Sequence, residues 1–194
     1  IATGNAGKVR ELHELFRGVP AEFASLTDFP HIAEVPETGS TFTENASLKA
    51  VGYARQAGML ALADDSGLVV DALDGEPGVL SARFGGDVGF DQKMQLILSR
   101  MAASIEHHRT ARFVCSMVIA DPSGRILTAA EGICEGRIAD APRGRGGFGY
   151  DPIFVPDGHQ HTFGELADEI KAEISHRALA GAKIMRYLLA FTAV

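Results

Sequence analysis

The pair of residues with the most evident chemistry in this sequence is Asp64-Asp65, which follows the apolar run 59–63 and precedes Ser66-Gly67. A short apolar run predicts a buried strand, and Gly67 predicts the turn that ends it. Two carboxylates at the end of a buried strand repel each other and lose solvation, and a bound cation would relieve both costs. The alternative is that the two aspartates only cap a turn.

A second candidate site is the glycine-rich segment at the start of the sequence. Residues 1–8, Ile-Ala-Thr-Gly-Asn-Ala-Gly-Lys, predict the end of a strand and a turn into a helix. Unpaired N–H groups at a helix N-terminus bind phosphate well, and Lys8 would add a positive charge. The segment is no P-loop, because Ala2 and Val9 stand where that motif requires Gly and Ser or Thr. At such a site Lys8 is expected to be exposed, so that its loss would leave stability nearly unchanged. The alternative is a plain strand-to-helix turn.

The segment 144–149 has the glycine spacing of a dinucleotide-binding loop but not its context. Pro152 follows closely and disfavours the helix that such a loop must open. We therefore interpret 144–149 as a flexible loop whose backbone a ligand can approach, followed by a short strand over 153–155.

A basic group lies further on, where Lys171 and Ser175-His176-Arg177 come before a predicted helix over 176–191. Positive side chains are disfavoured in the first turn of a helix, so a bound anion or an electron-rich base would explain them. An exposed basic turn is the alternative. The apolar positions that we expect to face the core are Leu179, Ala182, Met185, Tyr187, Leu188 and Phe191.

The elements that would position these residues can be sketched from the pattern. Thr41 and Glu44 predict a capping box at the start of a helix, on which Asn45 and Lys49 share a face. Short apolar runs alternate with helices in the N-terminal half, which predicts the α/β class. A helix over 90–103 precedes two long strand-like runs, 110–121 and 125–138, that predict a hairpin. The long hairpin favours a mixed, strongly bent sheet.

Composition narrows the class of protein. The 194 residues are enough to bury a full core, as one large domain or as two lobes. The net charge of −7 argues against nonspecific binding to nucleic acid. No apolar run approaches the length of a membrane span. Cys115 and Cys134 lie in apolar strands, so we expect buried free thiols and a reducing, cytoplasmic compartment.

Six short motifs follow one another along the chain. They are Thr3-Gly4-Asn5 with Lys8, Phe42-x-Glu44-Asn45-Ala46 with Lys49, Ala63-Asp64-Asp65-Ser66-Gly67-Leu68, Pro77-Gly78 with Ser81-Ala82-Arg83, Gly147-Phe148-Gly149-Tyr150-Asp151-Pro152, and Ser175-His176-Arg177. In this order they resemble, over nearly the whole chain, the inosine triphosphate pyrophosphatases, which hydrolyse nonstandard purine nucleoside triphosphates. One departure is Ile170 beside Lys171, where the family more often carries an acid.

The resemblance implies a fold and an activity. We expect a single domain over 1–194, in which helices form two lobes around a substrate cleft on an elongated, bent, mixed sheet, and a homodimer. The expected reaction is the Mg²⁺-dependent hydrolysis of ITP, dITP or XTP to the nucleoside monophosphate and pyrophosphate. The alternatives are a related pyrophosphatase that acts on pyrimidine triphosphates and a catalytically silent nucleotide-binding protein.

The resemblance also implies roles for individual residues. Asp65 would accept a proton or orient the attacking water, with Lys49 beside it as a second catalytic residue, and Glu37 and Asp65 would lie near the magnesium ion. Phosphate binding falls to Thr3, Gly4, Asn5, Lys8 and Lys49. The other substrate-binding residues are Ser66 and, around the base and sugar, Phe148, Gly149, Tyr150, Asp151, Lys171, His176 and Arg177. An aromatic face from Phe148 or Tyr150 would stack on the base, although plain core packing is the alternative for Phe148. Arg177 can only donate hydrogen bonds, so it suits a keto oxygen of the base.

Overall fold

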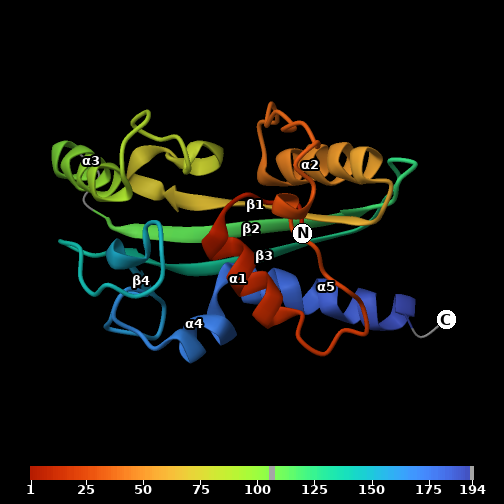
Figure 1. The fold of residues 1–194 in the computed structure, drawn as a ribbon. Helices are drawn as coiled ribbons and strands as arrows, with labels where there is room; N and C mark the ends of the chain where they lie inside the picture. Colours follow the sequence, from red (N-terminus) through yellow and green to blue (C-terminus); the bar gives the residue numbers. More distant parts are fainter. Residues whose placement is uncertain (105–107, 193–194) are drawn as a thin grey trace. The chain divides into compact units, whose positions relative to one another are not determined.

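The computed structural model describes residues 1–104 and 108–192, and this part of the chain is a mixed α/β protein (Figure 1). Its helices are α1 (Ala6–Leu15), α2 (Phe42–Ala57), α3 (Phe90–Ala103), α4 (Asp168–Ile174) and α5 (His176–Thr192). Its strands are β1 (Ala61–Val70), β2 (Thr110–Ala120), β3 (Ile126–Ile138) and β4 (Phe154–Pro156). They form one open antiparallel sheet in the order β1-β2-β3-β4. The predicted α/β class and the hairpin of β2 and β3 are thereby confirmed, whereas the sheet in the described chain is antiparallel and not mixed.

Strand β1 is longer than its sequence pattern indicated. Asp64 and Asp65 lie in its middle, and Gly67 does not end it, because Leu68 and Val70 continue the buried run. The predicted strand at the start of the chain is wrong for the described residues 1–5, which are not part of the sheet. A backbone hydrogen bond still links this segment to β1, because the N–H of Ala2 donates to the carbonyl of Leu62 at 2.8 Å.

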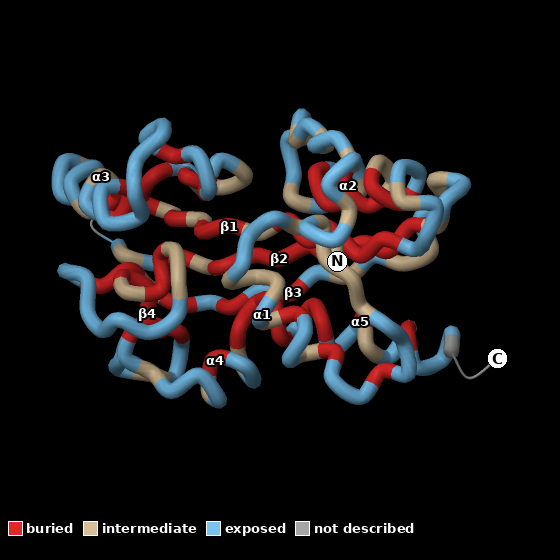
Figure 2. Tube along the Cα trace, in the orientation of Figure 1, coloured by how far each residue is buried: buried red, intermediate tan, exposed pale blue. Residues whose placement is uncertain are grey.

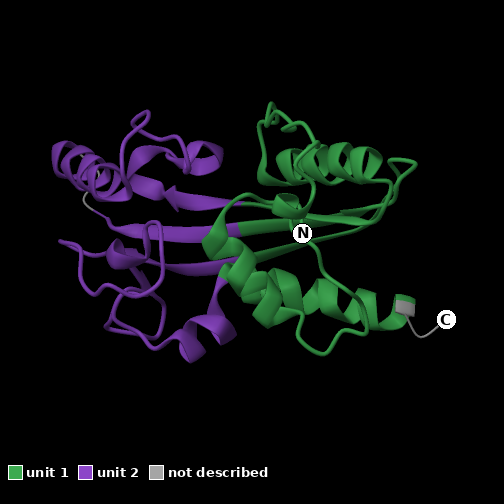
Figure 3. Ribbon diagram, in the orientation of Figure 1, with its two compact units in different colours: residues 1–65, 115–132, 176–194 green, residues 66–114, 133–175 purple. Residues whose placement is uncertain are grey.

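The described chain divides into two compact units (Figure 3). Unit 1 contains Ile1–Asp65, Cys115–Gly132 and the chain from His176 onward, and unit 2 contains Ser66–Val114 and Ile133–Ser175. Strands β1, β2 and β3 each pass from one unit into the other. The sequence-based expectation of a substrate cleft between two lobes stays a prediction.

Unit 1 is built in three layers, with helices on both faces of its part of the sheet. Two buried clusters define the layers. Small residues of α2 (Ala46, Ala50, Ala54) pack with Tyr53 on Ala61 and Ala63 of β1 and Val118 and Ala120 of β2. The opposite face of the sheet is covered by α1 and α5. The residues that pack there are Leu12 of α1, Phe16 at its C-terminal end, and Ala180, Ile184 and Leu188 of α5, and they contact Leu62 of β1 and Cys115, Met117 and Ile119 of β2. The two faces follow from the alternation of side chains along a strand.

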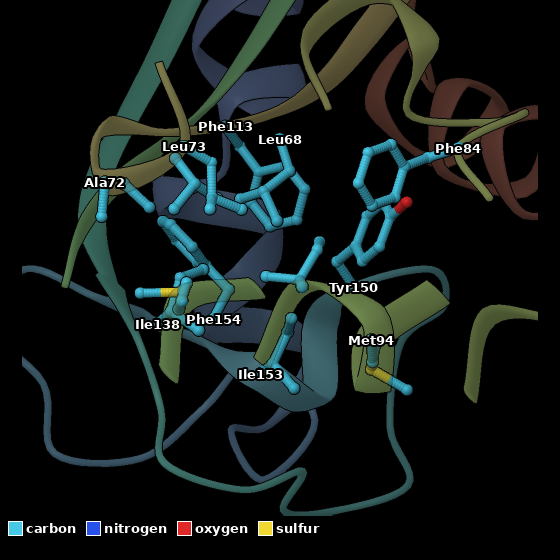
Figure 4. Close-up of a cluster of buried hydrophobic side chains, with 14 of the residues drawn as sticks. Leu68, Ala72, Leu73, Phe84, Met94, Phe113, Ile138, Tyr150, Ile153 and Phe154 are labelled. Carbon is cyan, nitrogen blue, oxygen red and sulfur yellow. The ribbon is translucent and has the colours of Figure 1, made fainter. Parts of the chain in front are cut away.

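Unit 2 has its own apolar core (Figure 4). Three aromatic rings lie at its centre, with the centroid of Phe154 4.6 Å from that of Phe113 and 5.5 Å from that of Phe163. Leu68 of β1 and Met94 of α3 pack into the same cluster. Buried aromatic pairs of this kind stabilise a core beyond the area that they bury.

Helix α5 has the predicted range, but its buried face is only partly the predicted one (Figure 2 colours the chain by burial). Leu188 is buried as expected, whereas Leu179 and Phe191 are 40% and 49% exposed, and Ala180 and Ile184 are buried instead. The reason is the close approach of α1, since a Cβ on Gly181 would come within 1.9 Å of a Leu15 methyl group.

The predicted start of α2 is confirmed atom by atom. The Thr41 hydroxyl accepts from the N–H of Glu44, and the Glu44 carboxylate accepts from the N–H of Thr41. This reciprocal pair is a capping box, which satisfies two N–H groups at the helix start. It also fixes the first turn of the helix that carries Asn45 and Lys49.

Two findings bear on the expected surroundings of the protein. Cys115 and Cys134 are free and buried, as predicted. No helix within the described ranges has both the length and the apolar character needed to cross a membrane.

The contact between β3 and α5 generates a stability prediction. A Cβ on Gly132 would lie 2.1 Å from the carbonyl oxygen of His176 and 2.4 Å from the backbone nitrogen of Ala180, and neither backbone atom can move aside freely. We expect Gly132→Ala to lower the free energy of unfolding by about 1–3 kcal/mol or more. Urea unfolding would measure this as a lower midpoint at an unchanged slope. The control is Gly89→Ala, because a Cβ there meets nothing within 4 Å; equal midpoints for the two variants would contradict the prediction.

Candidate functional site

The two adjacent aspartates of β1 serve opposite faces of the sheet. Asp64 shares the side of Leu62, which α1 and α5 cover, and Asp65 shares the side of Ala63, which α2 covers. Each carboxylate meets a lysine on its own face, Lys8 for Asp64 and Lys49 for Asp65. From the sequence we expected one bound cation to relieve the repulsion between the two carboxylates. In the structure each carboxylate instead has its own lysine as an ion-pair partner.

Asp64 is the centre of a buried ionic network in unit 1. Its Oδ2 atom lies 2.9 Å from Nζ of Lys8 and 3.3 Å from Nη2 of Arg177, and its side chain has no exposed surface. Arg177 also donates from Nη1 to Glu11 at 2.6 Å. Burial by itself would raise the pKa of the Asp64 carboxyl, but the charges of Lys8, Arg177 and Lys49 outweigh it and hold that pKa well below its usual range. Asp64 is therefore an anion throughout the physiological range.

Asp65 lies in a second network, formed with α2 and the segment before it. Nζ of Lys49 lies 3.1 Å from Oδ1 of Asp65 and 2.6 Å from Oε1 of Glu37, and the Asn45 amide donates to Oδ2 of Asp65 at 3.2 Å. Burial raises the pKa of the Asp65 carboxyl; the Lys49 charge opposes that rise and the Glu37 charge adds to it. Burial would lower the pKa of Lys49, but the neighbouring carboxylates outweigh it and raise that pKa.

The N-terminal segment is a capped helix start. The Asn5 side chain accepts from the N–H of Lys8 at 3.1 Å and so caps α1, while the Thr3 hydroxyl accepts from the N–H of Asn5 at 3.2 Å. Gly4 is exposed and a Cβ there would meet nothing within 4 Å. Lys8 is not the exposed lysine that we expected, because it neutralises Asp64 and its side chain is only 15% exposed.

A third group of predicted site residues lies in unit 2. Nζ of Lys171 in α4 contacts Oδ2 of Asp151 at 2.6 Å and lies 4.5 Å from the centroid of the Phe148 ring. The same Asp151 oxygen accepts from the N–H of Phe148 at 2.7 Å. The ammonium group thus meets a carboxylate and an aromatic face together, and a cation at this distance from a ring is attracted to it.

Tyr150 is anchored within the core of unit 2. Its hydroxyl donates to the carbonyl of Ser81 at 2.9 Å, its ring meets that of Phe90 edge to face, and burial raises its pKa. Gly149 precedes it with a φ of +68°, in the left-handed region. Ser66 directly follows Asp65 in β1.

The structure thus brings the predicted residues into two sets, each within one unit. Unit 1 holds Thr3, Gly4, Asn5, Lys8, Glu37, Lys49, Asp65, His176 and Arg177, and unit 2 holds Ser66, Phe148, Gly149, Tyr150, Asp151 and Lys171. His176 and Arg177 are the first residues of α5 and are both buried, so the exposed basic turn is excluded. Sequence analysis singled out Asp64 together with Asp65 but did not assign its partners, and it missed Glu11. For Asn45 the signals were the helix face that it shares with Lys49 and its place in the second motif.

Glu37 and Asp65 are the residues whose chemistry suits a metal ion. Within residues 1–104 and 108–192 no cluster of three or more histidine, cysteine or carboxylate side chains is close enough to hold one. Two carboxylates nevertheless converge on the position of the Lys49 ammonium. Carboxylate oxygens are the donors that Mg²⁺ prefers, and Mg²⁺ is commonly bound by one or two of them together with water and substrate phosphates. The donor set therefore fits this ion.

The sequence matches the family model described as "Ham1 family" over residues 1–187. Among curated relatives, a protein from Desulforamulus reducens named "dITP/XTP pyrophosphatase" is 50% identical over 97% of this chain and 94% of its own length. One of the same name from Geobacillus kaustophilus is 50% identical over 95% of this chain and 90% of its own.

Solved structures of similar proteins agree with these matches. A HAM1 protein from Coxiella burnetii superposes with a TM-score of 0.90 at 40% identity and covers 97% of this chain and 96% of its own. A nucleoside-triphosphatase, also titled dITP/XTP pyrophosphatase, from Mycobacterium abscessus has a TM-score of 0.76 at 43% identity, with 96% and 97% covered.

The Asp64 network predicts a pH-dependent contribution to stability. Removing one partner of a buried ion pair strands the others, so we expect Asp64→Asn to lower the free energy of unfolding at pH 7 by about 3–5 kcal/mol. The folded-state pKa of Asp64 lies below its unfolded value of about 3.9. Its contribution is therefore complete above that unfolded value and is lost as the pH falls towards the folded one. Urea unfolding at intervals from pH 7 to pH 3 should show the gap between the two proteins narrowing below about pH 5.

The control for this series is Asp140→Asn, which makes the same change on a side chain that is 95% exposed. We expect its unfolding midpoint to follow that of the wild type at every pH. A gap for Asp64→Asn that is as wide at pH 3 as at pH 7 would mean that its contribution is steric and not electrostatic.

Proposed function

The chain belongs to the Ham1 family, and we propose that it is an enzyme that hydrolyses nonstandard purine nucleoside triphosphates to the monophosphate and pyrophosphate. The curated relatives named dITP/XTP pyrophosphatase support this reaction and the deoxyinosine and xanthosine forms as substrates. The structural observation that carries the proposal is the Lys49 ammonium held between Asp65 and Glu37. Such a group combines the cation, the carboxylate base and the oxygen donors that phosphoryl hydrolysis requires.

Asp65 is the residue that would accept a proton from the attacking water. Burial raises the pKa of its carboxyl, which brings its basicity closer to neutral pH. Lys49 and Asn45 each contact one of its oxygens and so fix its orientation. A held base needs no reorganisation when the reaction occurs, and this lowers the barrier.

The ion that we assign to this site is Mg²⁺, held by Glu37 and Asp65. When bound, Mg²⁺ would neutralise phosphate oxygens and polarise the phosphorus for attack. Lys49 already neutralises the two carboxylates in part, and it would remain within reach of the same phosphates.

The start of α1 would bind the phosphate chain. Thr3, Gly4 and Asn5 precede the helix, whose N-terminal N–H groups and dipole favour a polyanion. Lys8 adds a charge there while Asp64 holds its side chain. Because the whole protein carries a charge of −7, local cations of this kind are needed to attract a triphosphate.

The remaining assigned residues would read the base and sugar. They are Phe148, Gly149, Tyr150, Asp151, Lys171, His176 and Arg177, while Ser66 is assigned to substrate binding without a particular part of the substrate. Lys171 and Arg177 have only donors, which suit the 6-keto oxygen of hypoxanthine or xanthine and oppose the amino group of adenine. Arg177 already donates to Glu11 and Asp64, so its contact with a base would have to share the guanidinium with them.

Two further assignments concern the setting of the enzyme. We assign it to the cytoplasm, because two free buried thiols are typical of a reducing compartment. We also assign a homodimer, on the basis of the motif order that it shares with inosine triphosphate pyrophosphatases; sedimentation or light scattering would measure its mass.

The proposed reaction predicts a substrate order. With Mg²⁺ present, we expect pyrophosphate release from ITP, dITP and XTP to exceed that from ATP by about 10⁴-fold in kcat/KM, because the 6-amino group of adenine leaves buried donors unpaired. We also expect these substrates to be preferred over GTP. Chelating the ion should abolish release from every substrate. The measurement is pyrophosphate and orthophosphate release across these triphosphates, CTP and UTP. Preference for CTP or UTP would indicate a pyrimidine enzyme, and no release from any would indicate a silent binding protein.

The assignment of Asp65 predicts a loss of turnover. Asp65→Asn keeps the shape of the side chain but removes its charge and basicity, so we expect kcat to fall by about 10²–10⁴-fold. The exposed Asp140→Asn is the matched control and should retain wild-type kcat. Activity of Asp65→Asn within a few-fold of wild type, in a protein that melts normally, would remove Asp65 from the catalytic role.

A further inference from the structure

Asn45 is a buried amide that makes a hydrogen bond from each of its two ends. It lies in the first turns of α2 and has no exposed surface. Its Nδ2 atom donates to Oδ2 of Asp65 at 3.2 Å, and its Oδ1 atom accepts from the N–H of Gly39 at 2.8 Å. One side chain therefore links β1 to the segment that carries Glu37.

Gly39 and Ser40, which follow Glu37, pack closely against the start of α2. A Cβ on Gly39 would lie 2.6 Å from Cβ of Glu44 and 2.8 Å from Oδ1 of Asn45, so only glycine allows this approach. The next residue, Ser40, donates from its N–H and its hydroxyl to the Glu44 carboxylate at 2.7 and 2.9 Å. The position of this turn is thus determined by side chains of α2.

The other side of Glu37 is attached to the same helix. The Gln56 amide both donates to the carbonyl and accepts from the N–H of Ala33, at 3.1 and 2.8 Å. The N–H of Val35 donates to the Tyr53 hydroxyl at 3.3 Å. Glu37 consequently sits on a short span that α2 holds at both ends, and Asn45 is the attachment that also reaches Asp65.

We propose that Asn45 is a positioning residue that sets the distance and orientation between Asp65 and Glu37, the two carboxylates assigned to the metal ion. The inference rests on the proposed function of that site. In this role Asn45 contacts neither substrate nor ion. It acts through its hydrogen bonds to the Asp65 carboxylate and to the N–H of Gly39. Hydrogen-bond partners of metal ligands are worth about 10–100-fold in metal affinity or activity when they are removed.

The chemistry of the amide explains why other side chains would not serve. The two bonds need one donor and one acceptor at the same position, and a neutral amide supplies both. An aspartate would keep the acceptor for Gly39 but would face the Asp65 carboxylate with a second acceptor. An alanine would give up both bonds and leave room for water in their place.

The two variants therefore separate the two ends of the amide. Asn45→Asp should lower kcat for dITP about 10–100-fold, because Asp65 loses its donor. In the same variant the Gly39 N–H should keep the slow hydrogen exchange of the wild type. Asn45→Ala should lower kcat similarly, raise the KM for Mg²⁺ about 10–100-fold and accelerate exchange at Gly39 at least about tenfold. Exchange is measured on the metal-free protein, so it does not depend on turnover.

The matched control is Gln95→Glu, which makes the same amide-to-carboxylate change at an exposed position of α3 in unit 2. Its kcat, its KM for Mg²⁺ and its Gly39 exchange should equal those of the wild type. If Asn45→Ala does not fold, Asn45→Asp still tests the link to Asp65, because it is isosteric and keeps the bond to Gly39.

Two results would overturn the inference in a folded protein. One is a kcat within twofold of wild type for Asn45→Asp, and the other is unchanged Gly39 exchange in Asn45→Ala. A wild type that releases pyrophosphate from no triphosphate would instead refute the proposed function. In that case the exchange measurement alone would decide whether Asn45 holds the turn before α2.

Discussion

In β1 successive side chains point to opposite faces of the sheet, so the neighbours Asp64 and Asp65 enter two different environments. Asp64 faces α1 and α5 and binds the structural cations Lys8 and Arg177, whereas Asp65 faces α2 and binds Lys49. A shift of one residue in the register of β1 would exchange these roles and place each carboxylate among the wrong partners. The two buried clusters of unit 1, which fix that register, therefore also determine which aspartate faces Lys49 and Asn45.

The ionic networks link the stability of unit 1 to the site that we propose. A buried carboxylate such as Asp64 is tolerated only when its charge is compensated, and its partners come from helices at opposite ends of the sequence. The same contacts hold Lys8 at the start of α1, where we propose that phosphate binds. Around Asp65 the balance differs, because Glu37 adds a second negative charge beside the single Lys49. That local excess of negative charge is the basis on which we propose a metal ion there.

Much of this arrangement was predictable from sequence because it depends on local patterns. Helices α1, α2, α3 and α5, the hairpin of β2 and β3 and the capping box at Thr41 follow from periodicity and short-range hydrogen bonds, whereas the short helix α4 was not predicted. The burial of α5 was mispredicted because the large residues suggested one face, whereas the close approach of Leu15 to Gly181 selects another. The contacts of Asn45 were missed because Asp65 is distant in sequence and because the contact with Gly39 depends on the path of the turn before α2, which no sequence pattern predicts.

Cys115 lies on the same face of the sheet as Asp64, in the buried core of unit 1. Burial raises the pKa of its thiol to about 12, and burial raises that of Cys134 to about 12 as well. Oxidants attack the thiolate, and neither sulfur ionises appreciably at neutral pH. Oxidative damage to the described chain would therefore begin at exposed thioethers, with Met59 at 45% exposure, and the protein should tolerate handling without a thiol reductant.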